Sequence, residues 1–188
     1  MWWLEPRPTV FRIAGLAIPM ALACLLTGCF EPLYGEKTLS GGPSLRTRMS
    51  AVSVEPIRAT NGSPSARIAV ELQNDLLFNF GGGQLAPNKT HQLHIDMYTQ
   101  VQQVIVDETT ARADVQQFGI TAGYILTEVA TNKPVVTGTA TARVSFDNPG
   151  QQQRFANARG QRDAENRAAK VIADDIRNRL ASYFAAGT

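Results

Sequence analysis

The stretch VVTGTATARVSF, residues 135–146, alternates between two kinds of side chain. Even-numbered positions from Val136 to Phe146 hold apolar residues or glycine, whereas odd-numbered positions from Thr137 to Ser145 are polar. Because successive side chains of a strand point to opposite faces, this alternation predicts a strand with one buried face and one face in water. The pattern is typical of an antiparallel sheet that is covered on one side only.

Two earlier segments show the same alternation and complete a three-stranded antiparallel meander. Apolar residues occupy most of the alternate positions in residues 93–101 and in residues 118–126. The alternation fails at residues 104–106, which predicts a β-bulge or a strand end nearby. The polar residues 107–114 and the turn sequence at residues 132–134 are the expected hairpin connections.

A helix is predicted for residues 64–80. Apolar residues recur there at every fourth position, at Ile68, Leu72, Leu76 and Phe80. This spacing places them on one face of a helix. Ser63 is a suitable N-cap and Pro64 suits the first helical position, whereas the glycines at 81–83 are expected to end the helix.

Two further elements complete the predicted fold. A β-prone run at residues 51–57 is expected to end near Pro56, which cannot donate to a sheet ladder. Residues 155–184 contain no proline and only one glycine, and their apolar residues keep the spacing of a long amphipathic C-terminal helix. The predicted fold is therefore α+β, with two helices packed on one face of a four-stranded mixed sheet, in the order strand, helix, three strands, helix. The first helix serves as the crossover that lets the first strand lie parallel to a neighbour.

The first 28 residues have the features of a secretory signal peptide. Arg7 and Arg12 accompany an uncharged apolar run at residues 13–26, and Leu26-Thr27-Gly28 comes directly before Cys29. The run is shorter than the roughly 20 apolar residues that a permanent transmembrane helix needs. Cys29 in this context resembles the lipidated cysteine of bacterial lipoproteins, in which two or more acyl chains give stable membrane anchoring. The alternatives are an ordinary cleavable signal with an incidental cysteine, or an uncleaved anchor.

These features divide the chain into a lipoprotein signal peptide at residues 1–28, a lipidated tether at residues 29–48 and one α+β domain at residues 49–188. Cleavage removes two of the 18 basic and one of the 16 acidic residues, so the mature net charge is +1. A near-neutral domain argues against nucleic-acid binding, which depends on a basic excess. Cys24 leaves with the signal and Cys29 carries lipid, so the domain has no thiol for a disulfide, a metal site or a nucleophile.

The sequence holds no residue set with the spacing of a catalytic or metal site. His91 and His94 are its two histidines, and a spacing of three on a strand points them to opposite faces. The acidic pairs Asp107-Glu108 and Asp174-Asp175 have no nearby histidine and are interpreted as solvated loop and helix residues. The glycines at 81–83 lack the lysine of a phosphate-binding loop. We therefore expect no metal, no cofactor and no enzymatic activity.

Two surfaces are candidates for binding. The predicted water-facing side of the sheet is rich in uncharged polar residues, namely Gln100, Gln102, Thr121, Thr127, Thr137, Thr139 and Thr141. Such a face can pack against a polar partner wall; the alternative is an ordinary solvated sheet with threonine present for strand propensity. The arginines of the C-terminal helix are interspersed with acids, which favours a solvated, ion-paired face over a strip for anionic lipid headgroups. Arg112 and Lys133, expected in hairpin loops, are further exposed cations.

The segment CFEPLYG, residues 29–35, combined with this order of elements, resembles the lipopolysaccharide-assembly lipoprotein family LptE, in particular its alphaproteobacterial type. In that family a lipidated cysteine is closely followed by a Pro-Leu-Tyr segment, here Pro32-Leu33-Tyr34, and then by a strand, a helix, three strands and a C-terminal helix. The resemblance extends from about residue 20 to about residue 185. Phe30 rather than aspartate follows Cys29, so the inner-membrane retention signal of many lipoproteins is absent.

The resemblance implies a non-enzymatic lipoprotein at the periplasmic face of the outer membrane. Such a protein sits as a plug in the large β-barrel LptD, supports the assembly of that barrel and assists delivery of lipopolysaccharide to the outer leaflet. Together with the polar sheet face, the resemblance indicates five candidate contacts with the barrel, namely Pro32, Leu33, Tyr34, Gln102 and Thr139. The exposed cations Arg112 and Lys133 are the candidates for contact with lipopolysaccharide phosphates.

Two other functions are weighed against this one. A periplasmic carrier that holds one acylated lipid needs a concave apolar cavity, which a sheet with one polar face disfavours. Uptake of an apolar dye by the domain discriminates the carrier from the plug. A periplasmic hydrolase needs a nucleophile, base or metal set that the sequence does not offer.

Overall fold

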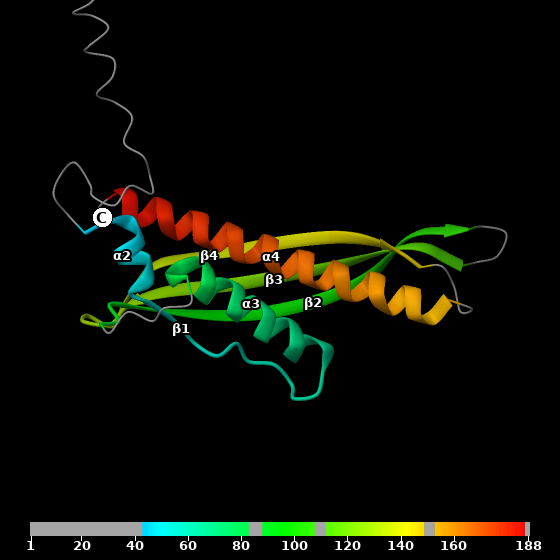
Figure 1. Cartoon of the computed structure of the whole chain (residues 1–188), viewed down its shortest axis with the longest axis horizontal. Helices are drawn as coiled ribbons and strands as arrows, with labels where there is room; N and C mark the ends of the chain where they lie inside the picture. Colours follow the sequence, from blue (N-terminus) through cyan, green and yellow to red (C-terminus); the bar gives the residue numbers. More distant parts are fainter. Residues whose placement is uncertain (1–42, 83–87, 108–111, 149–152, 187–188) are drawn as a thin grey trace, which may run out of the picture.

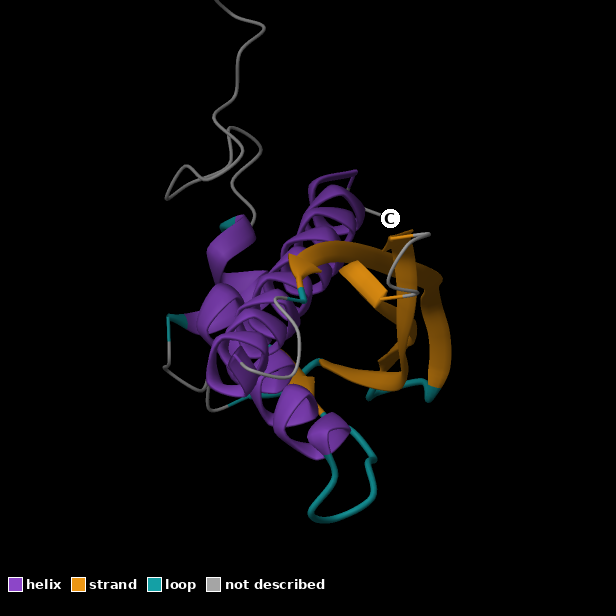
Figure 2. Ribbon diagram, turned by 90° about the vertical axis from the view of Figure 1, so that its right-hand side faces the viewer, coloured by secondary structure: helices purple, strands orange, loops and turns teal. Residues whose placement is uncertain are grey.

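Helices cover one face of a four-stranded sheet in the computed structural model of the chain (Figure 1). The structure describes residues 43–82, 88–107, 112–148 and 153–186. Along the chain the elements are α2 (Leu45–Ser50), β1 (Val52–Val54), α3 (Pro64–Gly81), β2 (His91–Asp107), β3 (Arg112–Glu128), β4 (Lys133–Asp147) and α4 (Arg154–Ala186). Figure 2 shows the two layers, with the helices on one side and the curved sheet on the other.

The sheet has the order β1-β2-β3-β4. β1 is parallel to β2, and the other two pairs are antiparallel, so the predicted mixed sheet and its crossover through α3 are confirmed. The register between β2 and β3 shifts at residues 103–106, where the sequence predicted a bulge. The two strands continue further toward their hairpin than the polar residues 107–114 indicated, because β2 ends at Asp107 and β3 starts at Arg112.

Both ends of α3 follow from local sequence. The Ser63 hydroxyl accepts a hydrogen bond from the backbone N–H of Ala66 over 3.2 Å, and Pro64 begins the helix. At the other end Gly82 has φ 62°, a left-handed conformation that lacks a steric cost only for glycine, and its N–H donates to the carbonyl oxygen of Phe78 over 2.7 Å. The predicted cap and stop signals are therefore confirmed.

The core lies between the sheet and the two long helices. Its largest fully buried side chains are Val52, Ile68, Leu72, Leu76, Leu93, Ile95, Ile120, Leu126, Ile172, Ile176 and Leu180. α4 also buries five alanines, at positions 164, 168, 169, 173 and 181. Small side chains let a long helix pack closely against its neighbours, so these alanines set the close approach of α4.

The helix α2 was not expected, because residues up to 48 were interpreted as a polar tether. Leu45 and Met49 are four residues apart and both are buried, whereas the residues between them are polar or basic. Two apolar residues in a six-residue segment are too few for a periodic signal, so the tertiary contact decides the helix. The Arg48 guanidinium donates to the carbonyl oxygen of Phe184 over 2.8 Å and ties α2 to the end of α4.

The molecule is elongated, and its two ends are built from different elements (Figure 1). α2, the turn between β3 and β4 and the last turn of α4 lie at one end, which we call the tether end. The start of α4 and the far ends of β2 and β3 lie at the other, which we call the distal end. No helix within the described ranges is both long and apolar enough to span a membrane.

Candidate interaction surface

The side of the sheet that faces away from the helices, here called the open face, is formed by alternate residues of β2, β3 and β4. The register places these positions side by side on neighbouring strands: Asp96, Tyr98, Gln100 and Gln102 on β2, Gln117, Thr121, Ile125 and Thr127 on β3, and Thr137, Thr139, Thr141, Arg143 and Ser145 on β4. Uncharged polar side chains dominate this set, as the sequence predicted. The open face therefore offers mainly hydroxyl and amide groups, and the charged members of this set are Asp96 and Arg143.

The predicted contact residues Gln102 and Thr139 are both exposed on the open face. Gly123 lies between Asp96 and Thr139 on the central strand, and no atom lies within 4 Å of the position that a Cβ would take there. Tyr98, with 66% of its surface exposed, projects from the same face near the edge of the sheet. The open face thus has a low centre and a tall aromatic side chain at its β2 side.

A charged cluster marks the tether-end side of the open face. The His94 Nδ1 lies 2.6 Å from a carboxylate oxygen of Glu55, and its Nε2 lies 3.4 Å from a carboxylate oxygen of Asp96. The hydrogen bond with Glu55 raises the pKa of His94 above its ordinary value, although partial burial acts in the opposite direction. His94 therefore gains positive charge more readily than a free histidine does.

His91 points to the opposite side of the strand, as predicted. Its ring packs edge-on against Phe184 of α4 with ring centroids 5.1 Å apart, and burial lowers the pKa of its imidazole. Within the described parts of the chain no three histidine, cysteine, aspartate or glutamate side chains are grouped as a metal site requires. The two histidines thus belong to different faces of the molecule.

The structure separates the two cations that the sequence proposed for anionic lipid. Lys133 is the exposed first residue of β4 and pairs across the turn with Glu128, at the tether end. Arg112 begins β3 at the other end of the strand, and its side chain lies outside the described residues. At about 3.3 Å per residue, the 17-residue β3 holds these positions some 50 Å apart. The two residues therefore cannot bind one phosphate together.

Four other predicted site residues lie outside the described residues. These are the lipidation site and the segment that follows it, namely Cys29, Pro32, Leu33 and Tyr34. They remain predictions from the sequence. The described chain begins at Pro43, next to α2 and at the tether end.

A group of unpaired arginines at the start of α4 was not singled out by the sequence. Arg167 pairs with Asp163 over 2.8 Å and Arg179 with Asp175 over 3.2 Å, as the mixed charge pattern predicted. Among the described residues no ion pair involves the earlier arginines of this helix, Arg154, Arg159 and Arg162. The aligned peptide dipoles of α4 add positive potential in its first turn, at Arg154, and no acidic residue in that turn offsets it. An acid-free run at residues 154–162 is the signal that identifies this group.

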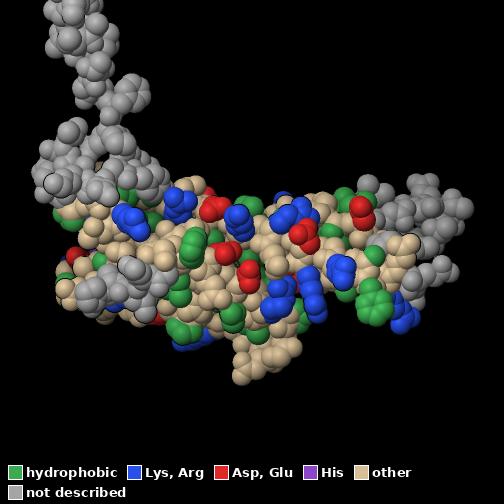
Figure 3. Space-filling view, viewed as in Figure 1, with side chains coloured by type: hydrophobic (Ala, Val, Ile, Leu, Met, Phe, Trp, Pro, Cys, Tyr) green, Lys and Arg blue, Asp and Glu red, His purple; other side chains and the backbone are tan. Residues whose placement is uncertain are grey.

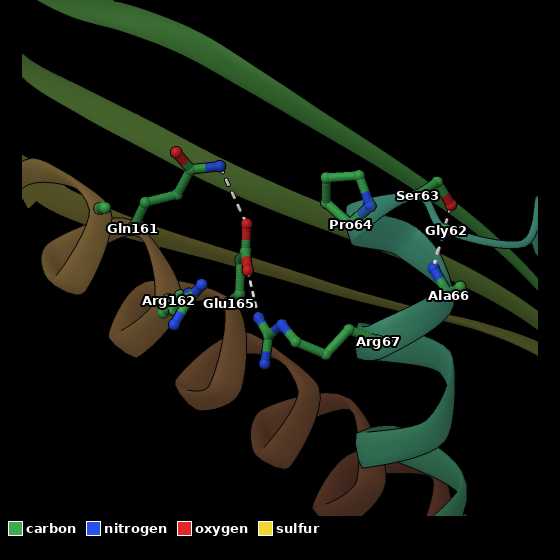
Figure 4. A pocket seen from close by; sticks show the side chains of 9 residues that line it. Gly62, Ser63, Pro64, Ala66, Arg67, Gln161, Arg162 and Glu165 are labelled. Carbon is green, nitrogen blue, oxygen red and sulfur yellow. Dashed lines mark hydrogen bonds and ion pairs between the residues drawn. The ribbon is translucent and has the colours of Figure 1, made fainter.

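Basic and acidic side chains are otherwise mixed over the helix side of the molecule, as Figure 3 shows. A pocket of about 530 Å³ opens there between the start of α3 and the first half of α4. Glu165 is buried in its wall, accepts a hydrogen bond from Gln161 over 2.9 Å and forms an ion pair with Arg67 of α3 (Figure 4). Glu165 therefore joins the two helices.

A second pocket, of about 640 Å³, lies at the tether end. Five of its ten lining residues are polar or charged, including Arg48 and Glu128. The other five are apolar or aromatic, including Val135 and Phe184, so the lining is mixed.

The family model of LptE, described as lipopolysaccharide-assembly, matches residues 49–180 of the chain. The chain belongs to the LptE family. Membership confirms the resemblance found in the sequence and assigns the protein a role in lipopolysaccharide assembly. LptE proteins are non-catalytic lipoproteins, in agreement with the expectation from the sequence.

Solved structures of bacterial lipoproteins share the LptE-like fold of this chain. A putative lipoprotein from Caulobacter crescentus is 17% identical, covers 77% of this chain and 97% of its own, and gives a TM-score of 0.59. Rare lipoprotein B from Shewanella oneidensis is 11% identical over 71% of this chain and 96% of its own, with a TM-score of 0.51. The minor lipoprotein from Acinetobacter baumannii is 14% identical over 70% of this chain and 90% of its own, with a TM-score of 0.50. No curated protein sequence matches the chain.

Proposed function

We propose that this LptE-family protein is held at the periplasmic face of the outer membrane by acyl chains on Cys29. There it plugs the lumen of an LptD-type β-barrel, assists the assembly of that barrel and supports delivery of lipopolysaccharide to the outer leaflet. Membership of the LptE family supports the role in lipopolysaccharide assembly. The open face is the observation that supports the finer assignment.

The chemistry of the open face fits the wall of a large barrel. The lumen of an outer-membrane barrel is polar, because its lipid-facing and lumen-facing residues alternate along each strand. Hydroxyl and amide side chains such as Thr139 and Gln102 can exchange hydrogen bonds with such a wall. Neither side chain carries a charge, so contact with the wall avoids the desolvation cost of an unpaired ion.

Contact with lipopolysaccharide is proposed at the distal end. Phosphate groups form strong, charge-assisted hydrogen bonds with guanidinium groups. Arg154, Arg159 and Arg162 make no ion pair within the described chain, and Arg112 begins β3 at the same end of the molecule. Lys133 lies at the tether end, so its proposed phosphate contact is a separate one.

Extraction of the full chain from membranes with a gentle detergent tests the proposed function. We expect the lipidated protein to co-purify with an LptD-type barrel, and mass spectrometry to find acyl chains on Cys29. Cys29→Ser is the matched variant, because it removes the acylated thiol and changes nothing in the domain. Recovery of the lipidated wild-type chain without any barrel would contradict the proposal.

A further inference from the structure

The two outer edges of the sheet are protected to different degrees. β4 forms one edge and carries Lys133, Pro134 and Arg143, with a register irregularity at its start. Lysine, proline and bulges are features that keep an edge strand from pairing with another chain. At the other edge, β2 is covered by β1 only along residues 91–93. Residues 95–104 of β2 contain no lysine, arginine or proline, and their one charged residue is Asp96.

The hydrogen bonds to β1 fix which backbone groups of β2 point outward. The Glu55 N–H donates to the carbonyl oxygen of Leu93 over 2.9 Å, and the His91 N–H donates to that of Ala51 over 3.4 Å. Odd-numbered residues of β2 therefore direct both backbone groups toward the β1 side, and even-numbered residues toward β3. Outward-facing groups of this kind continue beyond β1 at Ile95, Met97, Thr99 and Val101, of which Ile95 is buried, with 1% of its surface exposed. Within the described chain nothing pairs with them on that side.

β1 ends early for a local reason. Pro56 has no backbone N–H and cannot continue the ladder after Glu55. The chain then leaves the sheet for the connection to α3 (Figure 1). Large apolar or aromatic side chains remain exposed along the uncovered part of β2, at Tyr98 (66%), Val101 (48%) and Val104 (52%). The uncovered edge thus combines free backbone groups with apolar surface.

We propose that residues 97–101 of β2 accept an extended, uncharged segment of the barrel partner as an added strand, beyond the end of β1 and the buried Ile95. This inference rests on the proposed function, because it assigns one contact of the same partner. Edge pairing of this kind supplies main-chain hydrogen bonds, while neighbouring side chains give specificity. The edge itself offers an incoming segment only the single charge of Asp96, at its tether-end limit, so it matches a segment without charges.

The size of the edge indicates which partner covers it. A stable interface buries about 1,200–2,000 Å², far more than a five-residue strand edge provides alone. Two copies of the chain joined only at their β2 edges would fall short of this area. The open face is continuous with the edge through Tyr98 and Gln100, so a partner that covers the open face reaches both. A closed barrel has no free strand edge, and the added strand therefore comes from a loop or terminal segment of the barrel protein.

Hydrogen exchange at single-residue resolution tests the proposal on the full chain, free and in its barrel complex. Amides at 97, 99 and 101 are expected to exchange at least about tenfold more slowly in the complex. Outward amides of β4, at Thr139 and Thr141, are the matched positions on the protected edge and should change less. Unaltered exchange at the β2 edge in an intact complex overturns this inference and leaves the proposed function standing. Failure to recover any barrel complex contradicts both.

A proline substitution provides an independent test. Thr99→Pro removes one outward N–H and leaves the ladder with β3 intact, and we expect about tenfold lower recovery of barrel with the purified chain. Thr99→Val keeps the N–H and should recover barrel like the wild type. Undiminished recovery with folded Thr99→Pro overturns the inference; if this variant does not fold, the exchange measurement decides. Slowed exchange at the β2 edge in the free chain, with self-association, would instead identify a second copy as the occupant and overturn the proposal.

Discussion

The two faces of the sheet differ in composition although the same three strands build them. The covered face, which packs on α3 and α4, holds fully buried residues such as Leu93, Ile120 and Leu126. The open face carries exposed residues such as Thr121 and Thr139. Because side chains alternate along a strand, neighbouring residues in the sequence belong to different faces. Residues that stabilise the fold and residues proposed to contact the partner therefore lie on opposite sides of the sheet, and each strand contributes to both sets.

The largest expected difference between the faces is in the effect of truncation on stability. Leu126→Ala removes a fully buried side chain from the covered face and should lower the free energy of unfolding by about 3 kcal/mol. Thr139→Ala on the open face should change it by about 0.5 kcal/mol or less. Urea unfolding of the two variants measures both values. Equal losses would remove the distinction between the faces.

The ion pair that joins the helices of the covered side should have the next largest effect. Arg67→Ala leaves the buried carboxylate of Glu165 without its cation and should cost about 2 kcal/mol, below the usual range for a buried pair because Arg67 is partly exposed. Arg167→Ala is the matched control, since it breaks the surface pair with Asp163 and should cost about 0.5 kcal/mol or less. Chemical unfolding again provides the comparison. A loss for Arg67→Ala no greater than that for the control would show that the buried pair contributes nothing.

Two glycines on neighbouring strands sharpen the comparison. A Cβ at Gly138, on the covered face, would lie 2.6 Å from the Cζ atom of Tyr124, whose ring is buried. Gly138→Ala should therefore lower the free energy of unfolding by about 1–2 kcal/mol. Gly123→Ala, on the open face, meets nothing within 4 Å and should be neutral or slightly stabilising. Thermal unfolding of both variants tests this, and a clear destabilisation by Gly123→Ala would contradict it.

The smallest effect concerns His94 on the open face. The hydrogen bond with Glu55 raises the pKa of His94 in the folded chain. The resulting stabilisation of the fold is fully present below the pKa of an unfolded histidine, near 6.5, and is lost as pH rises through the folded pKa. His94→Gln should therefore lower the free energy of unfolding by less than about 1 kcal/mol near pH 5.5, and by less at higher pH. His91→Gln is the control on the covered face, because burial lowers the pKa of His91 and gives no low-pH stabilisation. A loss in the free energy of unfolding of His94→Gln, relative to the wild type, that grows with pH would contradict the prediction.

The sequence predicted those parts of the fold that depend on neighbouring residues. Ser63, Pro64 and Gly82 act within one turn of α3, and the alternation of residues 135–146 assigns each side chain of β4 to a face without knowledge of its partner. α2 was missed because its two buried residues pack against distant elements. The burial of Glu165 was beyond the sequence, because its partner, Arg67, lies 98 residues away.

The candidate site was predicted to a similar extent. The open face with Gln102 and Thr139 follows from alternation alone. Arg112 and Lys133 stay predictions as lipopolysaccharide contacts, and their placement at opposite ends of β3 was beyond the sequence, because no local pattern gives the distance between hairpins. The unprotected edge of β2 was also beyond the sequence, since it depends on how few residues of β1 pair with it.

The most direct test of the division between the faces is photo-crosslinking in intact membranes. A crosslinking residue placed at Gln102 or at Thr139 reports on the open face, and one at the exposed Lys170 on the outer surface of α4 is the control. We predict covalent adducts with an LptD-type barrel from both open-face positions, in higher yield than from Lys170. Absence of barrel adducts from Gln102 and Thr139, with the lipidated chain present in the outer membrane, would contradict the account.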